Sequence, residues 1–157
     1  MLDAILKRHS VREFRRDSLS PEVLTELIEA MRLAPSANNI QPWKFIIVTG
    51  TNRAKVAGAC VQEFVAEAPA LVIALSEESR DDYNLAFAVS HLLLEAAARG
   101  FGTCVVRSFA EDQVKEVLDI PTNYHVFAVI PVGYARENMD SSHDRKGLAS
   151  ILSWETF

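Results

Sequence analysis

Hydrophobic residues follow two patterns along this chain, a helical repeat in some segments and short continuous apolar runs in others. The clearest helical repeat follows Ser20, a suitable N-cap, and Pro21, which favours the first helical position. Apolar residues then recur every three or four positions until Pro35, which ends the helix. The same reasoning predicts helices over residues 2–8, 21–34, 52–66, 81–99 and 111–118.

The continuous apolar runs are rich in β-branched and aromatic residues, which favour strands buried on both faces. These runs cover residues 43–49, 69–75, 103–106 and 125–132. The helix at 81–99 is apolar nearly all round and ends before Gly100, as expected for a central buried helix. The sequence therefore predicts a mixed α/β fold with about four strands and five or more helices.

Length and composition restrict the class of protein further. The 157 residues fit one domain, residues 1–157, that is large enough to bury a core. A formal net charge of −5 argues against a dedicated nucleic-acid binder. No apolar stretch reaches the roughly 20 residues that a membrane-spanning helix needs, so no membrane association is expected. Cys60 and Cys104 are isolated, which predicts a reduced, cytoplasmic protein.

The C-terminal segment carries a set of large apolar residues after a polar stretch. A compact monomer rarely exposes such a set, so the segment is expected to pack on another surface, such as a second subunit. The residues are Leu148, Ile151, Leu152, Trp154 and Phe157.

A basic segment near the N-terminus is the first candidate for chemistry. Arg8–Arg12 combines guanidinium groups with the hydroxyl of Ser10, and both kinds of group donate hydrogen bonds to a phosphate. The same residues would also suit a solvated helix end, because cations near a helix C-terminus offset its dipole. Residue types alone leave both interpretations open and favour the helix end.

The second candidate is Ala34–Trp43, where two prolines bracket small and amide side chains between a helix and a strand. Amides both donate and accept, which suits the edge of a neutral heterocycle, although Asn, Ser and Pro are also ordinary turn residues. Two other segments have simpler explanations. Arg99–Cys104 fits the C-terminal cap of a helix, and Asp144–Gly147 fits a solvated turn.

Other familiar catalytic patterns are absent from the sequence. It contains no His-Glu-x-x-His metal helix, no Gly-x-Ser-x-Gly elbow and no Walker loop. His91 lies within an apolar helix and is expected to be a hydrogen-bonded core residue, while His125 begins a strand with no obvious partner. The thiolate of Cys104 would be disfavoured in an apolar strand. Neither a side-chain nucleophile nor a metal site is expected.

In their order along the chain, these segments resemble the nitroreductase family of FMN-dependent NAD(P)H oxidoreductases. The family's basic-basic-Ser-x-Arg-x-Phe opening is matched at Arg8–Phe14. Its Ala-Pro-Ser-x-x-Asn-x-Gln-Pro-Trp stretch is matched at Ala34–Trp43, the most specific piece. The later matches are Ala96–Gly102, Ile120–Pro121, Gly133–Tyr134 and Arg145–Leu148. The ordered set is far less probable by chance than any one member.

The resemblance implies an α+β fold whose central, mostly antiparallel sheet has four to five strands flanked by helices. It also implies a homodimer that binds FMN in a groove at the subunit interface. One chain would hold the phosphate and ribityl side through Arg8, His9, Ser10 and Arg12, with Arg145 and Lys146 approaching the same phosphate. The other chain would contact the flavin and its side chain through Pro35, Ser36, Ala37 and Asn39.

Two further positions follow from the resemblance. Gln41 would brace the loop, and the Arg107–Ser108 backbone would lie near flavin N5, with Ser108 where many relatives have glycine. The middle of the chain offers no clear counterpart to a basic residue that some relatives direct at the flavin, and Lys55 is a poor candidate. Many relatives also have extra helices over the flavin, so this shorter chain is expected to have a more open site.

The implied chemistry is a ping-pong reaction. NADH or NADPH gives a hydride to flavin N5 and leaves, and an electron-poor small molecule, such as a nitroaromatic, a quinone or a flavin, is then reduced. The cofactor carries this chemistry, so no catalytic side chain is required. Two alternatives stay open at this point: a flavin-binding storage or sensor protein without turnover, and other flavin chemistry such as dehalogenation or oxidative dehydrogenation.

Overall fold

The computed structural model describes residues 1–77, 82–136 and 144–157, and one four-stranded sheet forms its centre. The strands are β1 (Trp43–Val48), β2 (Ala70–Glu77), β3 (Gly102–Thr103) and β4 (Tyr124–Gly133). Their spatial order is β1-β2-β4-β3, and every neighbouring pair is antiparallel. β1 and β3 therefore lie at opposite edges of the sheet.

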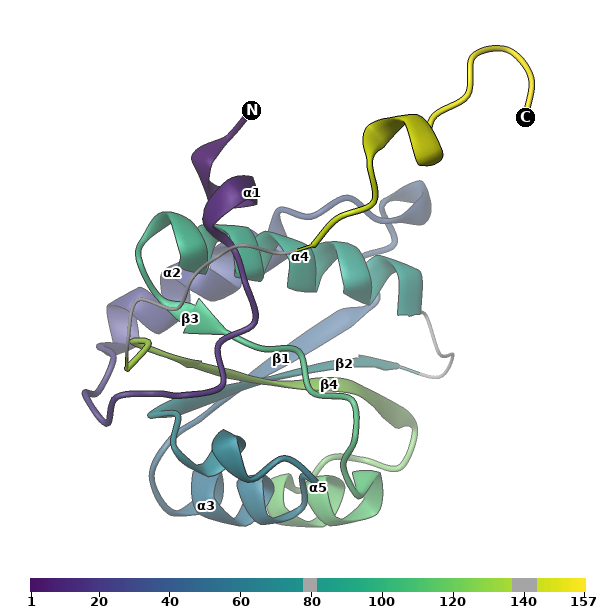
Figure 1. Ribbon diagram of the computed structural model, residues 1–157. Coiled ribbons are helices and arrows are strands. Elements are labelled where there is room, and N and C mark those ends of the chain that lie inside the picture. Colours follow the sequence, from purple (N-terminus) through teal and green to yellow (C-terminus); the bar gives the residue numbers. More distant parts are fainter. Residues whose placement is uncertain (78–81, 137–143) are drawn as a thin grey trace.

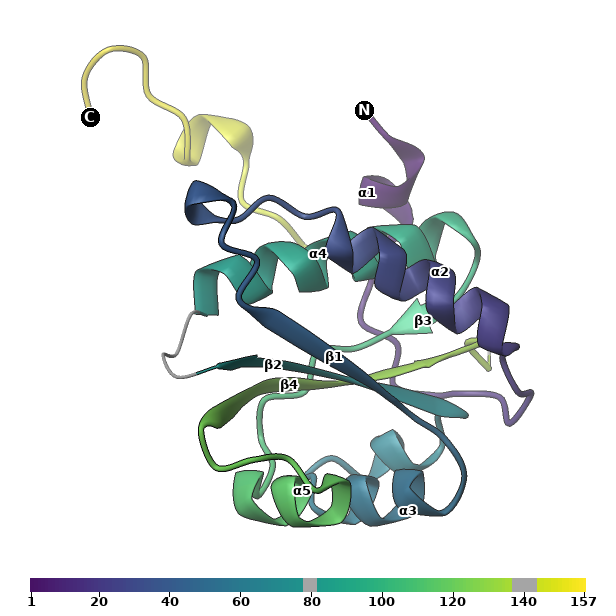
Figure 2. The ribbon, with the colours of Figure 1, turned by 180° about the vertical axis from the view of Figure 1, so that it is seen from behind.

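Helices cover both faces of this sheet (Figures 1 and 2). One face carries α1 (Asp3–Lys7), α2 (Pro21–Arg32) and α4 (Asp82–Ala98), and the other carries α3 (Gly50–Gly58) and α5 (Glu111–Leu118). Short 3-10 helices are found at η1 (Ala37–Asn39), η2 (Glu63–Ala66) and η3 (Leu148–Ser150). No helix in the described part of the chain is long and apolar enough to cross a membrane.

Strand β2 shows why the sheet needs continuous apolar runs. Successive residues of a strand point to opposite faces. Leu71 and Ile73 join the core cluster on the side of α3 and α5, whereas Val72 and Ala74 join the cluster on the side of α2 and α4. All four are fully buried, because helices pack on both faces of the sheet even though its strands are antiparallel.

The predicted α+β fold with a central antiparallel sheet is confirmed. Most predicted elements agree with the structure to within two or three residues, but the helix expected over 52–66 is interrupted. α3 ends at Gly58, and in the following turn the Ala59 carbonyl accepts from Ala110 N–H at 2.9 Å while Val61 N–H donates to the Ser108 carbonyl at 3.0 Å. Hydrogen bonds to a distant segment thus replace those of the helix, overriding local propensity.

The strand predicted over residues 103–106 is also shorter than expected. β3 contains only Gly102 and Thr103, and the chain beyond it returns to β4 through one isolated bridge between Val106 and Val129. The residues between these two points are apolar enough to suggest a continuous strand, yet they pair with β4 at each end only.

Candidate functional site

The basic segment Arg8–Arg12 lies along the β3 edge of the sheet, directly after α1. Arg8 caps α1, with its backbone N–H bonded into the helix. Ser10 forms a parallel bridge with Thr103, and Val11 N–H donates to the Thr103 carbonyl at 2.9 Å. The segment is therefore a helix end that continues as an extended stretch fixed to the sheet, and its assignment to a phosphate stays a prediction.

The segment can approach the sheet this closely because residue 102 is glycine. A Cβ on Gly102 would lie 2.7 Å from Val11 Cγ2 and 2.8 Å from Val11 Cβ, well inside contact distance. Val11 is buried in the space above this glycine. Since successive side chains of an extended segment point to opposite sides, the burial of Val11 turns Arg12 toward solvent.

Positive charge is available at this segment. Within residues 1–77, 82–136 and 144–157, no hydrogen bond or ion pair involves the side chain of Arg8 or Arg12. His9 Nδ1 lies 3.0 Å from the Lys7 carbonyl oxygen and donates to it, which fixes the ring next to the two arginines. Two guanidinium groups without a carboxylate partner in the described chain favour an anionic ligand here.

The thiol of Cys104 lies beneath the same segment. Burial raises its pKa, while the charge of Arg12 and a hydrogen bond with the Ser10 side chain lower it, and the net shift is upward. Burial also raises the pKa of the Cys60 thiol, to about 11. A thiolate is disfavoured at both positions, as predicted for Cys104, so neither cysteine is suited to act as a nucleophile.

The loop between α2 and β1 has an unusual backbone that its own polar groups hold. Asn38, Asn39 and Gln41 have φ angles of 50°, 57° and 49°, in the left-handed region that asparagine tolerates better than most residues. Ser36 Oγ accepts from the Gln41 backbone N–H at 3.0 Å, and Gln41 Nε2 donates to the Asn39 carbonyl at 3.2 Å. Gln41 thus braces the loop, as predicted.

Asn84, in the first turn of α4, anchors this loop to the body of the protein, a contact that sequence reasoning missed. Its side chain is buried, and its Oδ1 accepts from the Ala37 backbone N–H at 2.9 Å. The available signal was a polar residue within the most apolar helix, because a buried amide needs hydrogen-bond partners. The side chains of Pro35, Ala37 and Asn39 remain exposed.

Arg107 and Ser108 lie farther along the chain that leaves β3. Arg107 Nη2 donates to Asp82 Oδ2 at 3.1 Å, and its Cζ lies 4.2 Å from the centre of the Phe127 ring. The Ser108 carbonyl accepts from Val61 N–H at 3.0 Å, which ties the backbone here to the turn after α3. This pair is held near the start of α4, at the opposite end of that helix from Arg8–Arg12.

His125 has partners, contrary to the prediction from sequence. Its Nδ1 lies 3.2 Å from Glu111 Oε1, and its Nε2 lies 3.8 Å from Asp82 Oδ1. Burial raises the pKa of Glu111, but bonds from Val126 N–H and Lys115 and the charge of His125 outweigh it, so the net shift is downward. His91 is hydrogen-bonded as predicted, with Nδ1 3.1 Å from the Ala30 carbonyl.

Arg145 and Lys146 lie on the C-terminal segment, which projects away from the sheet and its helices (Figure 1). Arg145 Nη1 donates to the adjacent Asp144 carbonyl at 3.1 Å. Across the described ranges, no hydrogen bond or ion pair joins either residue to Arg8–Arg12. The apolar residues that follow are exposed, with Trp154 at 83%. The assignment of Arg145 and Lys146 to the phosphate stays a prediction.

The two candidate segments are far apart within one chain. Arg8–Arg12 pairs with β3 on its outer side and the loop leads into β1, so they lie at opposite edges of the sheet, about 19 Å apart across four usual strand spacings. They also lie at opposite ends of α4, with η1 and α1 above its two ends in Figure 2. About 18 Å of helix separates Asn84 from Ala96, near where β3 begins.

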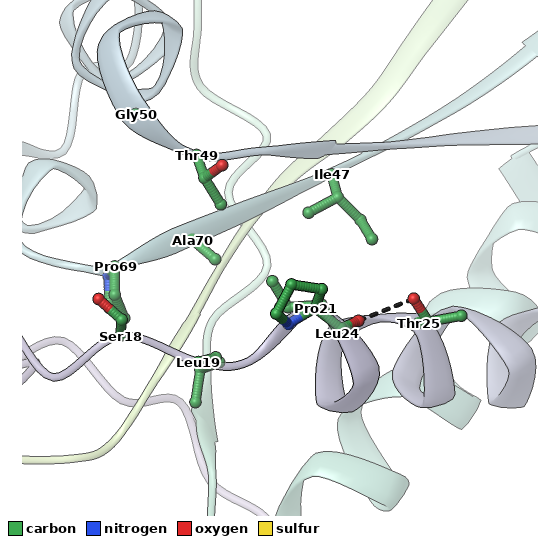
Figure 3. Close-up of a pocket in the computed structure, with 10 residues that line it drawn as sticks. All are labelled: Ser18, Leu19, Pro21, Leu24, Thr25, Ile47, Thr49, Gly50, Pro69 and Ala70. Carbon is green, nitrogen blue, oxygen red and sulfur yellow. Dashed lines mark hydrogen bonds between the residues drawn. The ribbon is translucent and has the colours of Figure 1, made fainter.

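Two hollows in the surface of the described chain lie apart from the candidate residues. One of about 390 Å³ lies between the start of α2 and the ends of β1 and β2, and Figure 3 shows its lining, which includes Leu24, Thr25 and Ile47. None of the candidate residues lines it. A second, of about 590 Å³, lies between α1, α2 and α4, with Leu2, Leu33 and Leu94 among its lining residues. It is apolar and open to solvent.

Comparisons with known proteins match this chain to one family. A family model described as "Putative TM nitroreductase" matches residues 1–156. The chain is 28% identical over 193 aligned positions to an NADH dehydrogenase of Thermus thermophilus, covering 96% of this chain and 94% of that protein. It is 24% identical over 163 positions to an iodotyrosine deiodinase of Thermotoga neapolitana, covering 85% of this chain and 88% of that protein.

The fold is also shared with solved structures. An FMN-dependent nitroreductase from Clostridium difficile R20291 superposes with a TM-score of 0.90 at 22% identity, with 100% of both chains covered. The full coverage means that the C-terminal segment and the N-terminal helix both have counterparts in that structure.

Proposed function

Because this chain belongs to the nitroreductase family, we propose that it is an FMN-dependent oxidoreductase that uses NADH or NADPH to reduce an electron-poor small molecule. The observation that carries the proposal is the pair of guanidinium groups at the β3 edge, half-buried Arg8 and exposed Arg12, which have no carboxylate partner among the described residues. The relatives named as an NADH dehydrogenase and an FMN-dependent nitroreductase support the same activity.

The residues of Arg8–Arg12 fit the phosphate of FMN. Arg8 and Arg12 offer charged donors, Ser10 offers a hydroxyl, and the bridge to Thr103 holds their backbone in place before any ligand arrives. His9 completes the group, with Arg145 and Lys146 of the C-terminal segment proposed to approach the same phosphate. Such preorganisation reduces the entropy lost when the cofactor is bound.

The site is proposed to be shared between two copies of the chain. Pro35, Ser36, Ala37 and Asn39 would have to come from a second chain, because their own loop lies at the opposite sheet edge from Arg8–Arg12. A two-fold axis across the exposed face of α4 would exchange the two ends of that helix and bring the segments together. Phe87 is 51% exposed on α4, and the apolar 590 Å³ hollow lies beside the same helix, which supports this face as the interface.

When bound, FMN would supply hydride transfer at N5 between the nicotinamide and the acceptor. The chain's own residues would position it. The Arg107–Ser108 backbone, tied to Val61, would fix the flavin end, and the braced loop of the partner subunit would cover the flavin's side chain. No side chain is assigned a catalytic role.

A second activity is favoured by one specific observation. The relative from Thermotoga neapolitana is named an iodotyrosine deiodinase, so at least one protein that is 24% identical to this chain is named for a dehalogenation reaction. Reductive dehalogenation would use the same FMN position and differ only in the molecule that is reduced.

Purified full-length protein tests the proposal directly. Protein loaded with FMN is expected to retain the yellow absorbance of an oxidised flavin through gel filtration and to elute as a dimer. Anaerobic addition of NADH or NADPH is expected to bleach it, and addition of a nitroaromatic or a quinone to restore the colour. Colourless protein that cannot be loaded with FMN would overturn the proposal. A yellow protein that neither nucleotide bleaches would instead indicate a flavin-binding protein without turnover.

Asn84→Ala is expected to weaken FMN binding roughly tenfold, because it leaves the Ala37 N–H without its buried partner, a loss of about 1–2 kcal/mol. Asn84→Asp keeps an oxygen acceptor and is expected to retain most of the affinity. Asn52→Ala, at an exposed asparagine of α3, is the matched control. Titration with FMN followed by flavin fluorescence measures all three, and equal affinities for Asn84→Ala and wild type would contradict the role of Asn84.

A further inference from the structure

We propose that the Arg107 guanidinium gives this site a preference for electron acceptors that carry an anionic group such as a carboxylate. The inference rests on the proposed function, since it takes FMN to lie along the chain that leaves β3. Nothing in the family match assigns a role to this side chain.

The position of Arg107 places it away from the phosphate group and near the proposed reaction centre. Ser10 bridges Thr103 at the phosphate end. Arg107 lies four residues farther along, about 13 Å away for an extended chain. The bridge between Val106 and Val129 holds the intervening segment on the sheet. Arg107 is therefore too far from the proposed phosphate position to serve it.

Two contacts hold the guanidinium in a defined orientation. Asp82 Oδ2 accepts from Nη2 at 3.1 Å, and the plane of the group lies near the Phe127 ring, with Cζ 4.2 Å from its centre. A cation near an aromatic ring is favourable and limits the motion of the side chain. The side chain is nevertheless 49% exposed, so an incoming molecule can reach it.

Most of the donors of this guanidinium remain available. An arginine side chain has five N–H donors. Among residues 1–77, 82–136 and 144–157, its one hydrogen bond is the one to Asp82. The nearby Glu111 accepts from Lys115 at 3.0 Å and from Val126 N–H, so it is already paired and does not compete for Arg107. The remaining edge of the guanidinium matches the two oxygens of a carboxylate.

The reaction in question is a two-electron reduction. A nitroaromatic carboxylate would take the hydride of NAD(P)H and one proton from solvent, giving the nitroso carboxylate, water and NAD(P)⁺. The carboxylate itself does not react, so its contact with Arg107 would orient the acceptor without taking part in the electron transfer. This contact makes Arg107 a specificity-determining residue of the proposed reaction.

Paired acceptors of nearly equal shape test the inference. We would measure kcat/KM for 4-nitrobenzoate and 4-nitrobenzamide with FMN-loaded full-length protein and NADH, and compare the ratio of the two values between variants. Arg107→Met is expected to lower the nitrobenzoate-to-nitrobenzamide ratio about tenfold or more, the usual range for a lost charged hydrogen bond. Arg107→Lys keeps the charge and is expected to retain part of the preference.

Arg136→Met is the matched control. Arg136 is similarly exposed, and its Nη2 lies 3.1 Å from Glu67 Oε2, the same distance as in the Arg107 pair. Its backbone N–H donates to the Glu13 carbonyl, so it lies beside the N-terminal segment and away from the flavin end of the proposed site. The nitrobenzoate-to-nitrobenzamide ratio of Arg136→Met is expected to equal that of wild type. Added salt screens exposed charges, so the wild-type ratio should fall with ionic strength while that of Arg107→Met stays flat.

The outcomes separate two kinds of failure. An unchanged ratio in Arg107→Met, with both acceptors slowed in parallel, would mean that Arg107 has only a structural role and would overturn the inference alone. A wild-type protein that NADH or NADPH bleaches but that reduces neither nitro compound would also overturn the inference alone. A yellow wild-type protein that neither nucleotide bleaches would overturn the proposed function, and the inference with it.

Discussion

Arg12→Ala is expected to weaken FMN binding by about 1.5–3 kcal/mol, the usual cost of a hydrogen bond to a charged group, which is roughly 10- to 150-fold in Kd. The effect should be large because Arg12 is exposed beside the sheet edge and, in the described ranges, has no carboxylate that would offset its charge. Fluorescence titration with FMN measures it. Arg16→Ala, four residues farther along and also exposed, serves as the control and should retain wild-type affinity.

Arg145→Ala is expected to have a smaller effect of the same sign if the C-terminal segment approaches the phosphate in the dimer. Unchanged FMN affinity in both Arg12→Ala and Arg145→Ala would contradict the phosphate assignment. An effect of Arg12 alone would leave the N-terminal segment as the phosphate site and remove the C-terminal one.

Mixed dimers of Arg12→Ala and Asn84→Ala extend this test to the arrangement of the subunits. If each site takes its phosphate group from one chain and its loop from the other, the mixed dimer has one site with both defects and one with neither. It should therefore bind one FMN per dimer with wild-type affinity. If each site were built from a single chain, both sites would carry one defect and no wild-type site would appear.

Gly102→Ala is expected to have the second large effect. Its new Cβ would lie 2.7–2.9 Å from three atoms of the buried Val11 side chain, so the N-terminal segment would have to move away from β3. Overpacking of this kind typically costs about 1–3 kcal/mol of stability. Because Ser10 and Arg12 flank Val11, FMN affinity should fall together with the melting temperature.

Gly58→Ala provides the control for that substitution. A Cβ at Gly58, the last residue of α3, would meet no atom within 4 Å, and helical alanine is favoured over glycine by up to about 1 kcal/mol. Its melting temperature should be equal to that of wild type or higher, with unchanged FMN affinity. A Gly102→Ala protein that behaves like Gly58→Ala in both measurements would show that the segment tolerates displacement.

Local patterns predicted most of the fold. The Ser20–Pro21 start of α2 and the apolar runs of β2 and β4 are determined by neighbouring residues, and the structure places all three as expected. The break after Gly58 was missed because its hydrogen bonds go to Ala110 and Ser108, about fifty residues away. Pairings over such a distance leave no periodic signal in the sequence.

The family and its two characteristic segments were also recognisable from sequence, because both are contiguous motifs. The distance between these two segments could not be recognised from sequence, since it depends on which strands form the edges of the sheet. Asn84 and the partners of His125 were missed for the same reason. Asp82 and Glu111 lie in different helices and reach His125 only through the folded chain.

The first turn of α4 holds two functional elements at once. Asp82 fixes Arg107, and Asn84, two residues later, fixes the loop through Ala37. In the proposed dimer, Arg107 serves the site of its own chain while the loop serves the site of the partner subunit. Because both chains of a homodimer carry the same sequence, a change in this turn that disturbs both contacts would alter the acceptor preference and the cofactor retention of both sites. Substitutions in this turn that favour a new acceptor would therefore be tolerated only if the loop contact of Asn84 is kept and both subunits still bind FMN.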